Sequence, residues 1–522
     1  MQAASPLTTG LGETAQRSQS VVEILSALCG WIPLAGGVFL VLLYIGFYLA
    51  NPALPGNNLA YPQGWWGWWD QSQYIESARA MRVFDLSPAK HWFPLGYSLL
   101  AAPFTGVLPM HPFFFVDLAG LLISYVAFQS FALRLGVARP WSALVFVLAA
   151  AADPRLAETW AVPWNTTVSA ALIWMAFACM AAQLAVPSQA LDRWRLFRFA
   201  VFGLLLGAIP LVRPTDALVA AICGATLVAA ELWWKRARWQ DAVALCLGGA
   251  VVLLPYALLY LRIYGPHLTG YMLQSRQLGF AYAQLPWKTY VLLVEPHPWF
   301  PNGVSLLARF PWIALTLAAV VPVLWRLRGP ARLMAAMLAA AIAAYCILFF
   351  SYVDLLPTGL WLYGNVHYFQ WVFPGVGLFA FLLLRELWSG DRRLAVGSLI
   401  VTLLVLSVRI EAVPAGDDIP ARMLQFPGVT GGWADTYFAQ AALQDAKGNL
   451  ANIYDMRLLP DGEGSRAVAL RREFSGPVQW VQGGKPNPFA AQGRPLRWGE
   501  RLTLGYPCWL PPFPCQVLRP RS

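Results

Sequence analysis

Residues 240–262 read QDAVALCLGGAVVLLPYALLYLR, with one acid near the start and one arginine at the end. An apolar run of this length matches the roughly 20 residues that a helix needs to cross the hydrocarbon core of a bilayer. Further apolar stretches occur along the chain, the third of them short, and together they predict eleven membrane-spanning helices. The predicted spans are residues 30–50, 112–133, 141–152, 164–186, 199–212, 215–233, 240–262, 311–325, 333–352, 368–384 and 394–408.

The composition of the whole chain agrees with many spans. Hydrophobic residues make up 58% of the 522 residues and charged residues 12%, about half the charged share of a soluble protein. This excludes a disordered or collagen-like chain, and seven cysteines are too few for a disulfide scaffold. Only Cys508 and Cys515 follow the last span, and spacing alone leaves their pairing open. The predicted fold class is therefore an all-α polytopic membrane protein.

The net charge of +11 gathers in connectors that the eleven-span order places on one side. These connectors hold Arg134 and Arg139; Arg193, Arg195 and Arg198; Lys235, Arg236 and Arg238; Arg326, Arg328 and Arg332; and Arg385, Arg392 and Arg393. Short positive loops stay in the cytoplasm, so the outside receives residues 51–111, 153–163, 263–310 and the tail after Val408. The positive charge thus indicates topology, and we expect no nucleic-acid partner.

The pattern divides the chain into three parts. Residues 1–29 lack a charged n-region, so we expect a cytoplasmic tail without a cleavable signal peptide. Residues 30–408 form the membrane domain. Residues 409–522 are rich in Gly, Pro and Asp, and the alternating runs Arg466–Phe474 and Val478–Gln482 predict a small extracytoplasmic domain that contains strands.

The first predicted outer loop contains polar side chains at helical spacing. From Asp70 onward the sequence predicts a helix, in which one face carries Asp70, Gln73, Tyr74 and Ser77. Glu76 points away from Asp70 on this helix. A carboxylate, an amide and a phenol therefore converge beside a run of tryptophans. Two other interpretations stay open here: Asp70 caps the helix, and the tryptophans form an interfacial belt.

The same loop resembles a known family. An acid with a tyrosine four positions on, followed by PLGYSLL at 94–100, resembles the first periplasmic loop of GT-C glycosyltransferases. Within that superfamily it is similar to bacterial relatives of protein O-mannosyltransferases and of the lipid A aminoarabinose transferase. The stretches LVRPT (211–215), YGPHLTGY (264–271) and VHYFQWVFP (366–374) resemble further parts of these enzymes in the same order.

The resemblance implies a multi-span enzyme of the bacterial inner membrane that takes a sugar from a polyprenyl-phosphate donor on the periplasmic face. The chain departs from the family at three positions. Gln71 follows Asp70 where many relatives have a second acid, Trp92 stands where aminoarabinose-type transferases have lysine, and His367 stands where arginine is usual. The sequence therefore specifies neither the sugar nor the acceptor, which is a lipid, a glycan or a protein.

The resemblance also implies roles for individual residues. Asp70 matches the loop carboxylate that in these enzymes is the catalytic base or lies beside it. The base takes the proton of the acceptor hydroxyl, while cations hold the leaving phosphate. The candidate substrate-binding residues are Gln73, Tyr74, His91, Asp153, Glu158, Arg213, Arg276, Lys288, His297, His367 and Tyr368. Among the cations, Arg213 is the strongest candidate for a functional role, because burying an ionisable group at membrane depth between two spans costs free energy and usually serves a function. The alternative interpretation is that its side chain extends to the lipid headgroups. For Asp153, the alternative interpretation is that it caps a helix.

The sequence contains no motif that is typical of other kinds of catalytic or cofactor site. There is no zinc-type His/Cys spacing, Walker loop, Gly-x-Ser-x-Gly or dinucleotide fingerprint, so we expect neither a nucleotide-sugar donor nor ATP coupling. No cofactor is specified, and a divalent metal stays open. Two alternatives to a glycosyltransferase remain. One is a transporter or flippase of lipid-linked glycans, which would need ionisable residues inside spans and repeat symmetry, and the other is an O-antigen polymerase or ligase.

Overall fold

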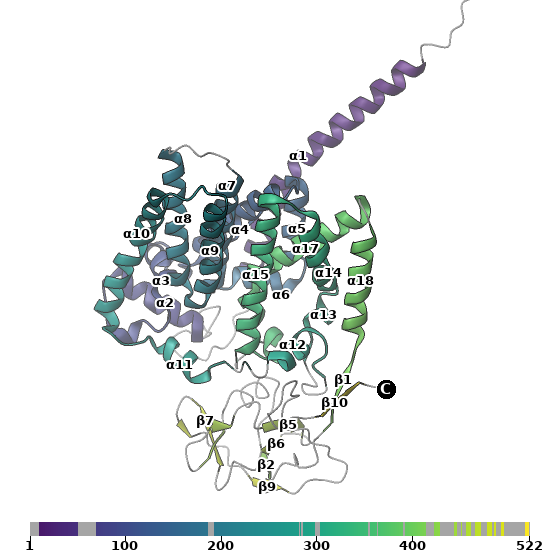
Figure 1. Cartoon of the computed structure of the whole chain (residues 1–522). Coiled ribbons are helices and arrows are strands. Elements are labelled where there is room, and N and C mark those ends of the chain that lie inside the picture. Colours follow the sequence, from purple (N-terminus) through teal and green to yellow (C-terminus); the bar gives the residue numbers. More distant parts are fainter. Residues whose placement is uncertain are drawn as a thin grey trace, which may run out of the picture. The chain divides into compact units, whose positions relative to one another are not determined.

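The computed structural model describes residues 10–50, 69–185, 193–280, 282, 285–297, 303–352, 355–362, 364–389 and 392–413, and nine strand segments between 422 and 520. Figure 1 shows the helices and strands of the chain. The chain divides into two compact units. The first unit comprises Met1–Met272, Val323–Ile342 and His367–Leu382. The second comprises Leu273–Pro322, Ala343–Val366 and Leu383–Ser522. Each unit is described by itself below.

Helices make up the first unit. Those that lie wholly within it are α1 (Gly10–Ala50), α2 (Trp69–Arg82), η2 (Pro88–Lys90), α3 (Leu95–Ala101), η3 (Ala102–Gly106), α4 (Phe114–Arg134), α5 (Arg139–Ala151), α6 (Pro154–Ala161), α7 (Asn165–Ala185), α8 (Arg193–Val212), η4 (Pro214–Asp216), α9 (Ala217–Trp233) and α10 (Trp239–Tyr264). Parts of α11 (Gly270–Leu278), α14 (Ile313–Arg326), α15 (Gly329–Ser351), η6 (Asn365–Phe369) and α17 (Val372–Ser389) complete it.

Every predicted span coincides with a helix, the last of them with α18 (Arg392–Ser407). Within the described residues, seven helices are long and apolar enough to cross a membrane. These are Gly30–Ala50, Phe114–Arg134, Asn165–Ala185, Arg193–Val212, Pro214–Trp233, Trp239–Tyr264 and Gly329–Ser351. Two further apolar helices, Arg139–Ala151 and Ile313–Arg326, are shorter. The prediction of a mostly helical integral membrane protein is confirmed.

Glycines bring α8 and α10 into close contact along their length (Figure 1). A Cβ atom on Gly248 would lie 1.8 Å from the carbonyl oxygen of Ala200, and one on Gly203 would lie 1.9 Å from that of Leu245. Small residues let two membrane helices approach until their backbones touch, which is the main source of packing energy where the surrounding solvent is lipid. The pair α8–α10 therefore depends on the absence of these two side chains.

We expect Gly248→Ala to destabilise the protein, because the clash is with backbone and no rotamer relieves it. The free energy of unfolding should fall by about 1–3 kcal/mol or more, since about 1–3 kcal/mol is typical of an overpacked core. Thermal unfolding of the detergent-solubilised variant measures it. Gly46→Ala is the matched control, since nothing lies within 4 Å of a Cβ at Gly46 on α1. Equal melting temperatures for the two variants would contradict the close packing of α8 and α10.

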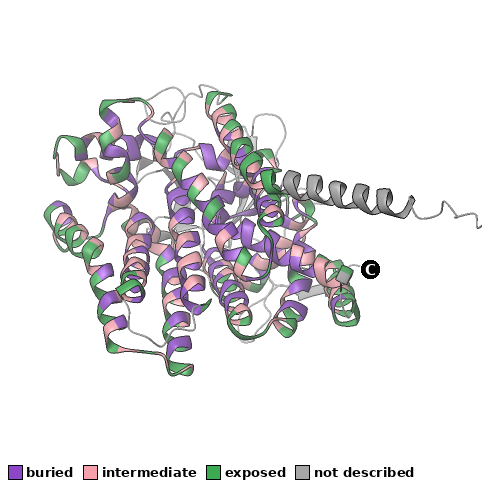
Figure 2. Cartoon of the chain, turned by 90° about the horizontal axis from the view of Figure 1, so that it is seen from above, coloured by how far each residue is buried: buried purple, intermediate pink, exposed green. Residues whose placement is uncertain are grey.

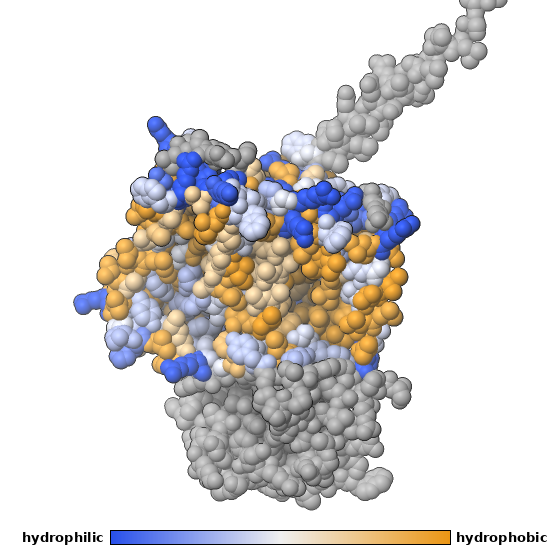
Figure 3. Space-filling model, in the orientation of Figure 1, coloured by the Kyte–Doolittle hydropathy of each residue, from blue (hydrophilic) through white to orange (hydrophobic). Residues whose placement is uncertain are grey.

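The outward side of α10 is apolar. Its exposed large side chains are Trp239, Val243, Leu247, Val251, Leu253, Leu254, Leu258 and Leu261. Figure 3 shows hydrophobic side chains over the middle of α8 and α10 and hydrophilic ones near the start of α8. Figure 2 shows that buried and exposed positions mix along the same helices. A helix that exposes leucine and valine along its middle is suited to lipid, and this supports the membrane assignment.

A buried ion cluster joins α8, α9 and α10 at the end where the basic loops lie. The guanidinium of Arg195 lies 2.6 Å from a carboxylate oxygen of Asp241 and 2.8 Å from one of Glu231, which Arg236 also contacts at 2.7 Å. Two of the basic loop residues are therefore paired with acids. Removing one member of such a buried cluster leaves an uncompensated charge, so these four residues fix the three helices to one another.

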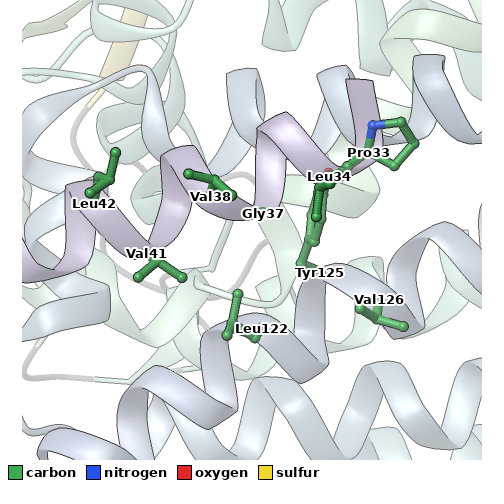
Figure 4. A pocket seen from close by; sticks show the side chains of 9 residues that line it. All are labelled: Pro33, Leu34, Gly37, Val38, Val41, Leu42, Leu122, Tyr125 and Val126. Atoms are coloured by element: carbon green, nitrogen blue, oxygen red, sulfur yellow. The ribbon is translucent and has the colours of Figure 1, made fainter. Parts of the chain in front are cut away.

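An apolar groove of about 420 Å³ lies between α1 and α4 (Figure 4). It is lined by Pro33, Leu34, Gly37, Val38, Val41, Leu42, Leu122, Tyr125 and Val126. The hydroxyl of Tyr125 donates to the carbonyl oxygen of Pro33 at 2.7 Å. The lining offers no other side-chain polar group, so it carries no chemistry that could act on a substrate.

The second unit contains the remaining helices and all described strands. They are α12 (Leu285–Leu293), α13 (Leu306–Arg309), α16 (Pro357–Leu362), α18 (Arg392–Ser407), β1 (Ile410–Val413), β2 (Arg422–Pro427), β3 (Leu443–Asp445), β4 (Leu450–Ala451), β5 (Met456–Pro460), β6 (Ser465–Leu470), β7 (Val478–Gln482), β8 (Lys485–Pro486), β9 (Gln492–Arg494) and β10 (Val517–Pro520). The strands pair in the orders β1-β10, β5-β6-β2-β9 and β4-β3-β7-β8. Strand β6 overlaps the first part of the predicted run Arg466–Phe474, and β7 coincides with the predicted run Val478–Gln482. Cys508 and Cys515 lie outside the described residues.

Candidate functional site

The candidate site begins with α2, which confirms the helix predicted from Asp70 onward. Asp70 lies half-buried in the first turn, where the positive end of the helix dipole favours a carboxylate. Tyr74, one turn later, is 3% exposed. Its ring stacks on Phe93 at 4.5 Å and meets Tyr97 edge-on at 5.0 Å. The polar face predicted for α2 is therefore turned towards other parts of the protein.

Charged neighbours act on the hydroxyl of Tyr74, among them the acids Asp70 and Asp117 and the guanidinium of Arg213. Burial is the main cause that raises the pKa of Tyr74 well above its ordinary value of 10.0, and the carboxylate of Asp70 raises it further, whereas Arg213 lowers it. The carboxylate of Asp70 and the guanidinium of Arg213 thus each lie within electrostatic reach of this phenol. Because its pKa is raised, the phenol stays protonated at neutral pH and can donate a hydrogen bond.

Contacts from two neighbours hold α2 in place. The side-chain amide of Gln71 donates to the carbonyl oxygen of Pro163 at 3.3 Å, and the hydroxyl of Ser98 donates to that of Tyr74 at 3.2 Å. Gln73 is half-buried on the same helix. These bonds fix α2 to the turn before α7 and to α3, so the first turn of α2 is anchored from both sides.

His91 is engaged within the protein at both ring nitrogens. Its Nε2 contacts the carbonyl oxygen of Asp85 at 2.9 Å, so this nitrogen carries the hydrogen. Its Nδ1 then accepts from the hydroxyl of Ser77 at 2.9 Å. Burial lowers the pKa of His91, which favours the neutral ring. His91 therefore links the segment that follows α2 to Ser77 on that helix.

The stretch from Pro94 to Leu100 docks against the end of α8. A Cβ atom on Gly96 would lie 2.5 Å from the carbonyl oxygen of Leu211, so glycine permits the approach at this point. The hydroxyl of Tyr97 donates to Asp117 at 2.8 Å and fixes the next residue to the start of α4. This close contact explains the Pro-x-Gly-Tyr pattern: it brings α3 to within two residues of Arg213.

Arg213 follows α8 and is only 4% exposed. Its guanidinium carbon lies 4.8 Å from the ring centre of Tyr368, a distance suited to a cation–π contact. Its Nε lies 3.8 Å from a carboxylate oxygen of Asp216. The side chain is therefore held inside the first unit between a ring and a carboxylate.

The short helix η6 brings His367 and Tyr368 to the same place. His367 is 3% exposed, and its ring lies flat on Trp164 at 4.0 Å with an angle of 5° between the planes. The amide of Gln370 donates to the carbonyl oxygen of Thr159 at 2.7 Å, which anchors η6 to α6. The chain segments around residues 164, 213 and 368 thus meet at one end of the first unit.

Asp153 and Glu158 have local partners on α6. The carboxylate of Asp153 accepts from the backbone nitrogens of Arg155 at 2.8 Å and Leu156 at 3.2 Å, which is the geometry of an N-cap. Glu158 pairs with Arg155 at 3.1 Å at the surface. The structure therefore agrees with the interpretation of Asp153 as a cap.

Three further candidates belong to the second unit. Arg276 is exposed on α11. Lys288 is fully buried and donates to the carbonyl oxygen of Tyr352. His297 is exposed, and its Nδ1 lies 2.5 Å from a carboxylate oxygen of Glu295. In the second unit, Lys288 ties α12 to the end of α15.

The structure adds residues that the sequence analysis did not select. Asp216 is fully buried beside Arg213 and accepts a hydrogen bond from Ser169 at 2.5 Å. Trp164 stacks on His367. The spacing of Arg213 and Asp216, three apart, was a local signal that could have identified Asp216. Nothing in the sequence indicates Ser169, which lies on a different helix.

The described residues offer no cluster for a metal. Among them, no three His, Cys, Asp or Glu side chains come together in a way that could hold an ion. Four cysteines of the described residues form no disulfide bond: Cys179, Cys223, Cys246 and Cys346.

Among comparisons with known proteins, only the comparison of structures finds a similar protein. No protein-family profile matches the chain, and no curated protein matches it. Two solved structures are similar to it. ArnT from Cupriavidus metallidurans bound to undecaprenyl phosphate has 17% identity and a TM-score of 0.43 over 72% of this chain, and the apo form of the same protein has 19% identity and a TM-score of 0.42 over 73%. The chain spans 63% of the length of ArnT.

Proposed function

We propose that the protein is a membrane glycosyltransferase that moves a sugar from a polyprenyl-phosphate donor to a hydroxyl acceptor, with Asp70 as catalytic base. One observation carries the proposal. Tyr74, one turn after Asp70 on α2, and Val212, the neighbour of Arg213, belong to one buried cluster, so two segments that are far apart in the sequence meet at one site. A carboxylate that accepts a proton, a phenol that donates and a guanidinium that binds phosphate are the groups that this reaction needs.

The reaction is a direct displacement. The oxygen of the acceptor hydroxyl attacks the anomeric carbon, its proton passes to Asp70, and the bond between that carbon and the phosphate oxygen breaks. The electron pair of the broken bond leaves with the polyprenyl phosphate. The products are the glycosylated acceptor and the free lipid phosphate, so no oxidant or nucleotide is consumed.

Arg213 is suited to the leaving group. Negative charge grows on the phosphate as the bond breaks, and a preorganised cation in a buried site stabilises that charge more than water would. A guanidinium also presents donors in a planar fork that matches phosphate oxygens. Tyr74 and Gln73 line the side of α2 next to the base and supply neutral donors for hydroxyl groups of the sugar or the acceptor. His367 and Tyr368 complete the surroundings of Arg213.

A doubly labelled donor separates this activity from transport. Purified protein in proteoliposomes receives a polyprenyl-phosphate sugar that carries one label on the sugar and another on the phosphate. We expect the two labels to separate, the sugar passing to an acceptor or to water. Movement of both labels together across the bilayer would instead indicate a flippase, and transfer of a whole glycan from a lipid diphosphate would indicate a polymerase or ligase.

We further propose an eleven-span topology with the site facing the periplasm of a bacterial inner membrane, and residues 409–522 as an extracytoplasmic domain. The support comes from the basic connectors. In the first unit, Arg134 and Arg139 join α4 to α5, and Lys235 joins α9 to α10. Both connectors lie at helix ends opposite to the one that carries Arg213, and positive loops stay cytoplasmic.

This topology predicts the behaviour of fused reporters. A reporter that is active only outside the cytoplasm should be active when fused after Ser522 and inactive when fused after Gly390, because one span separates the two points. A cytoplasm-specific reporter at the same two points should give the reverse pair of signals. Activity of the outside reporter at Gly390, with none at Ser522, would overturn the orientation.

A further inference from the structure

Arg213 does not stand alone in the site. Asp216 lies three residues later, at the start of α9, and is fully buried. Its carboxylate accepts hydrogen bonds from the hydroxyls of Ser169 on α7 at 2.5 Å and Thr215 at 3.2 Å. One carboxylate oxygen also lies 3.8 Å from the Nε of Arg213. The acid is thus fixed by two hydroxyls and faces the guanidinium.

The pairing of Arg213 with Asp216 keeps the arginine side chain from leaving the site. An arginine side chain is long and flexible, and near a membrane surface it tends to extend its charge to the headgroups. The carboxylate of Asp216 opposes this movement, because opposite charges attract strongly where water is scarce. The ring of Tyr368 supports the guanidinium as a second contact.

We infer that Asp216, held by Ser169, is a positioning residue that fixes Arg213 for the phosphate of the lipid-linked donor. The inference rests on the proposed function and names the residues that determine how tightly the donor phosphate is bound. Asp216 itself does not touch the donor. It acts by keeping the guanidinium inside the site and directed at the phosphate.

The test is a set of steady-state measurements on the full-length purified protein. Asp216→Asn keeps the size and the hydrogen-bonding capacity of the side chain and removes its charge. We expect the KM for the polyprenyl-phosphate sugar to rise about tenfold, a change typical of coupled neighbours, while the KM for the acceptor stays constant. Ser169→Ala should raise the donor KM in the same direction by a smaller factor. Ser124→Ala, which removes another buried serine hydroxyl of a membrane helix, is the matched control and should leave the donor KM unchanged.

A double-variant comparison distinguishes positioning from a structural role. In an Arg213→Gln background, Asp216→Asn should restore thermal stability, because the buried charge disappears, but it should not change the donor KM further. A purely structural pair would instead recover both stability and transfer in the double variant. A wild-type donor KM in folded Asp216→Asn and in Ser169→Ala overturns the inference while leaving the proposed function intact. Absence of donor cleavage by the wild-type protein would overturn the proposed function itself.

Discussion

Asp70→Asn should abolish nearly all sugar transfer while the protein still folds. Asparagine has the size of aspartate and suits a helix start about as well, so α2 should keep its contacts with Pro163 and Ser98. It cannot take a proton from an attacking hydroxyl. Loss of a general base typically costs a factor of about 10²–10⁴, and we expect the turnover number to fall by that much with little change in the donor KM.

Two neighbours on α2 provide the comparison. Tyr74→Phe keeps the ring stacked on Phe93 and removes only the hydroxyl, so its effect should be milder than that of Asp70→Asn. Glu76→Gln removes a carboxylate of the same helix that pairs with Lys90 at 2.8 Å, and it should transfer sugar at the wild-type rate. Near wild-type turnover by a stable Asp70→Asn protein would reduce Asp70 to a residue that stabilises the helix start.

Arg213→Gln should be the second most damaging substitution. Removing one charged donor from a site where negative charge develops costs a factor of about 10²–10³ in turnover. Arg213→Lys keeps the charge but loses the planar fork and part of the contact with Tyr368, so it should recover only part of the rate. The rate of sugar transfer and the donor KM, measured for both variants, check this order.

The control for Arg213 is another arginine of the first unit. The side chain of Arg155 is 55% exposed and pairs with Glu158 at the surface, and such pairs contribute little to stability. Arg155→Gln should therefore behave as wild type in both rate and melting temperature. An Arg213→Gln protein that folds and transfers sugar as fast as Arg155→Gln would remove Arg213 from the site.

The membrane helices and one face of the site were predictable because they depend on local patterns. The length of the apolar runs was enough to locate every helix that coincides with a predicted span. The four-residue spacing of Asp70 and Tyr74 placed both on one side of α2. The start of α1 at Gly10 was missed, because residues 10–29 carry no continuous apolar run. Residues 153–163 were predicted only as an outer connector, without the bounds of α6, although Asp153-Pro154 is a cap followed by the proline that often opens a helix.

The rest of the site depends on contacts between distant segments, which no spacing rule encodes. Ser169 reaches Asp216 across two different helices, and Trp164 stacks on His367, which comes from a segment two hundred residues later. The close approach of Gly96 to Leu211 likewise requires the packed structure. Membrane helices pack through such individual contacts of small and polar residues, so their partners become visible only in three dimensions.

The anomeric configuration of the transferred sugar tests the central claim most directly. If the acceptor oxygen, deprotonated by Asp70, displaces the polyprenyl phosphate in one step, NMR of the purified product should show a configuration opposite to that of the donor. Retention of the donor configuration would require a covalent glycosyl-enzyme intermediate, with a carboxylate acting as nucleophile. That result, or the absence of any transferred sugar, would contradict the account.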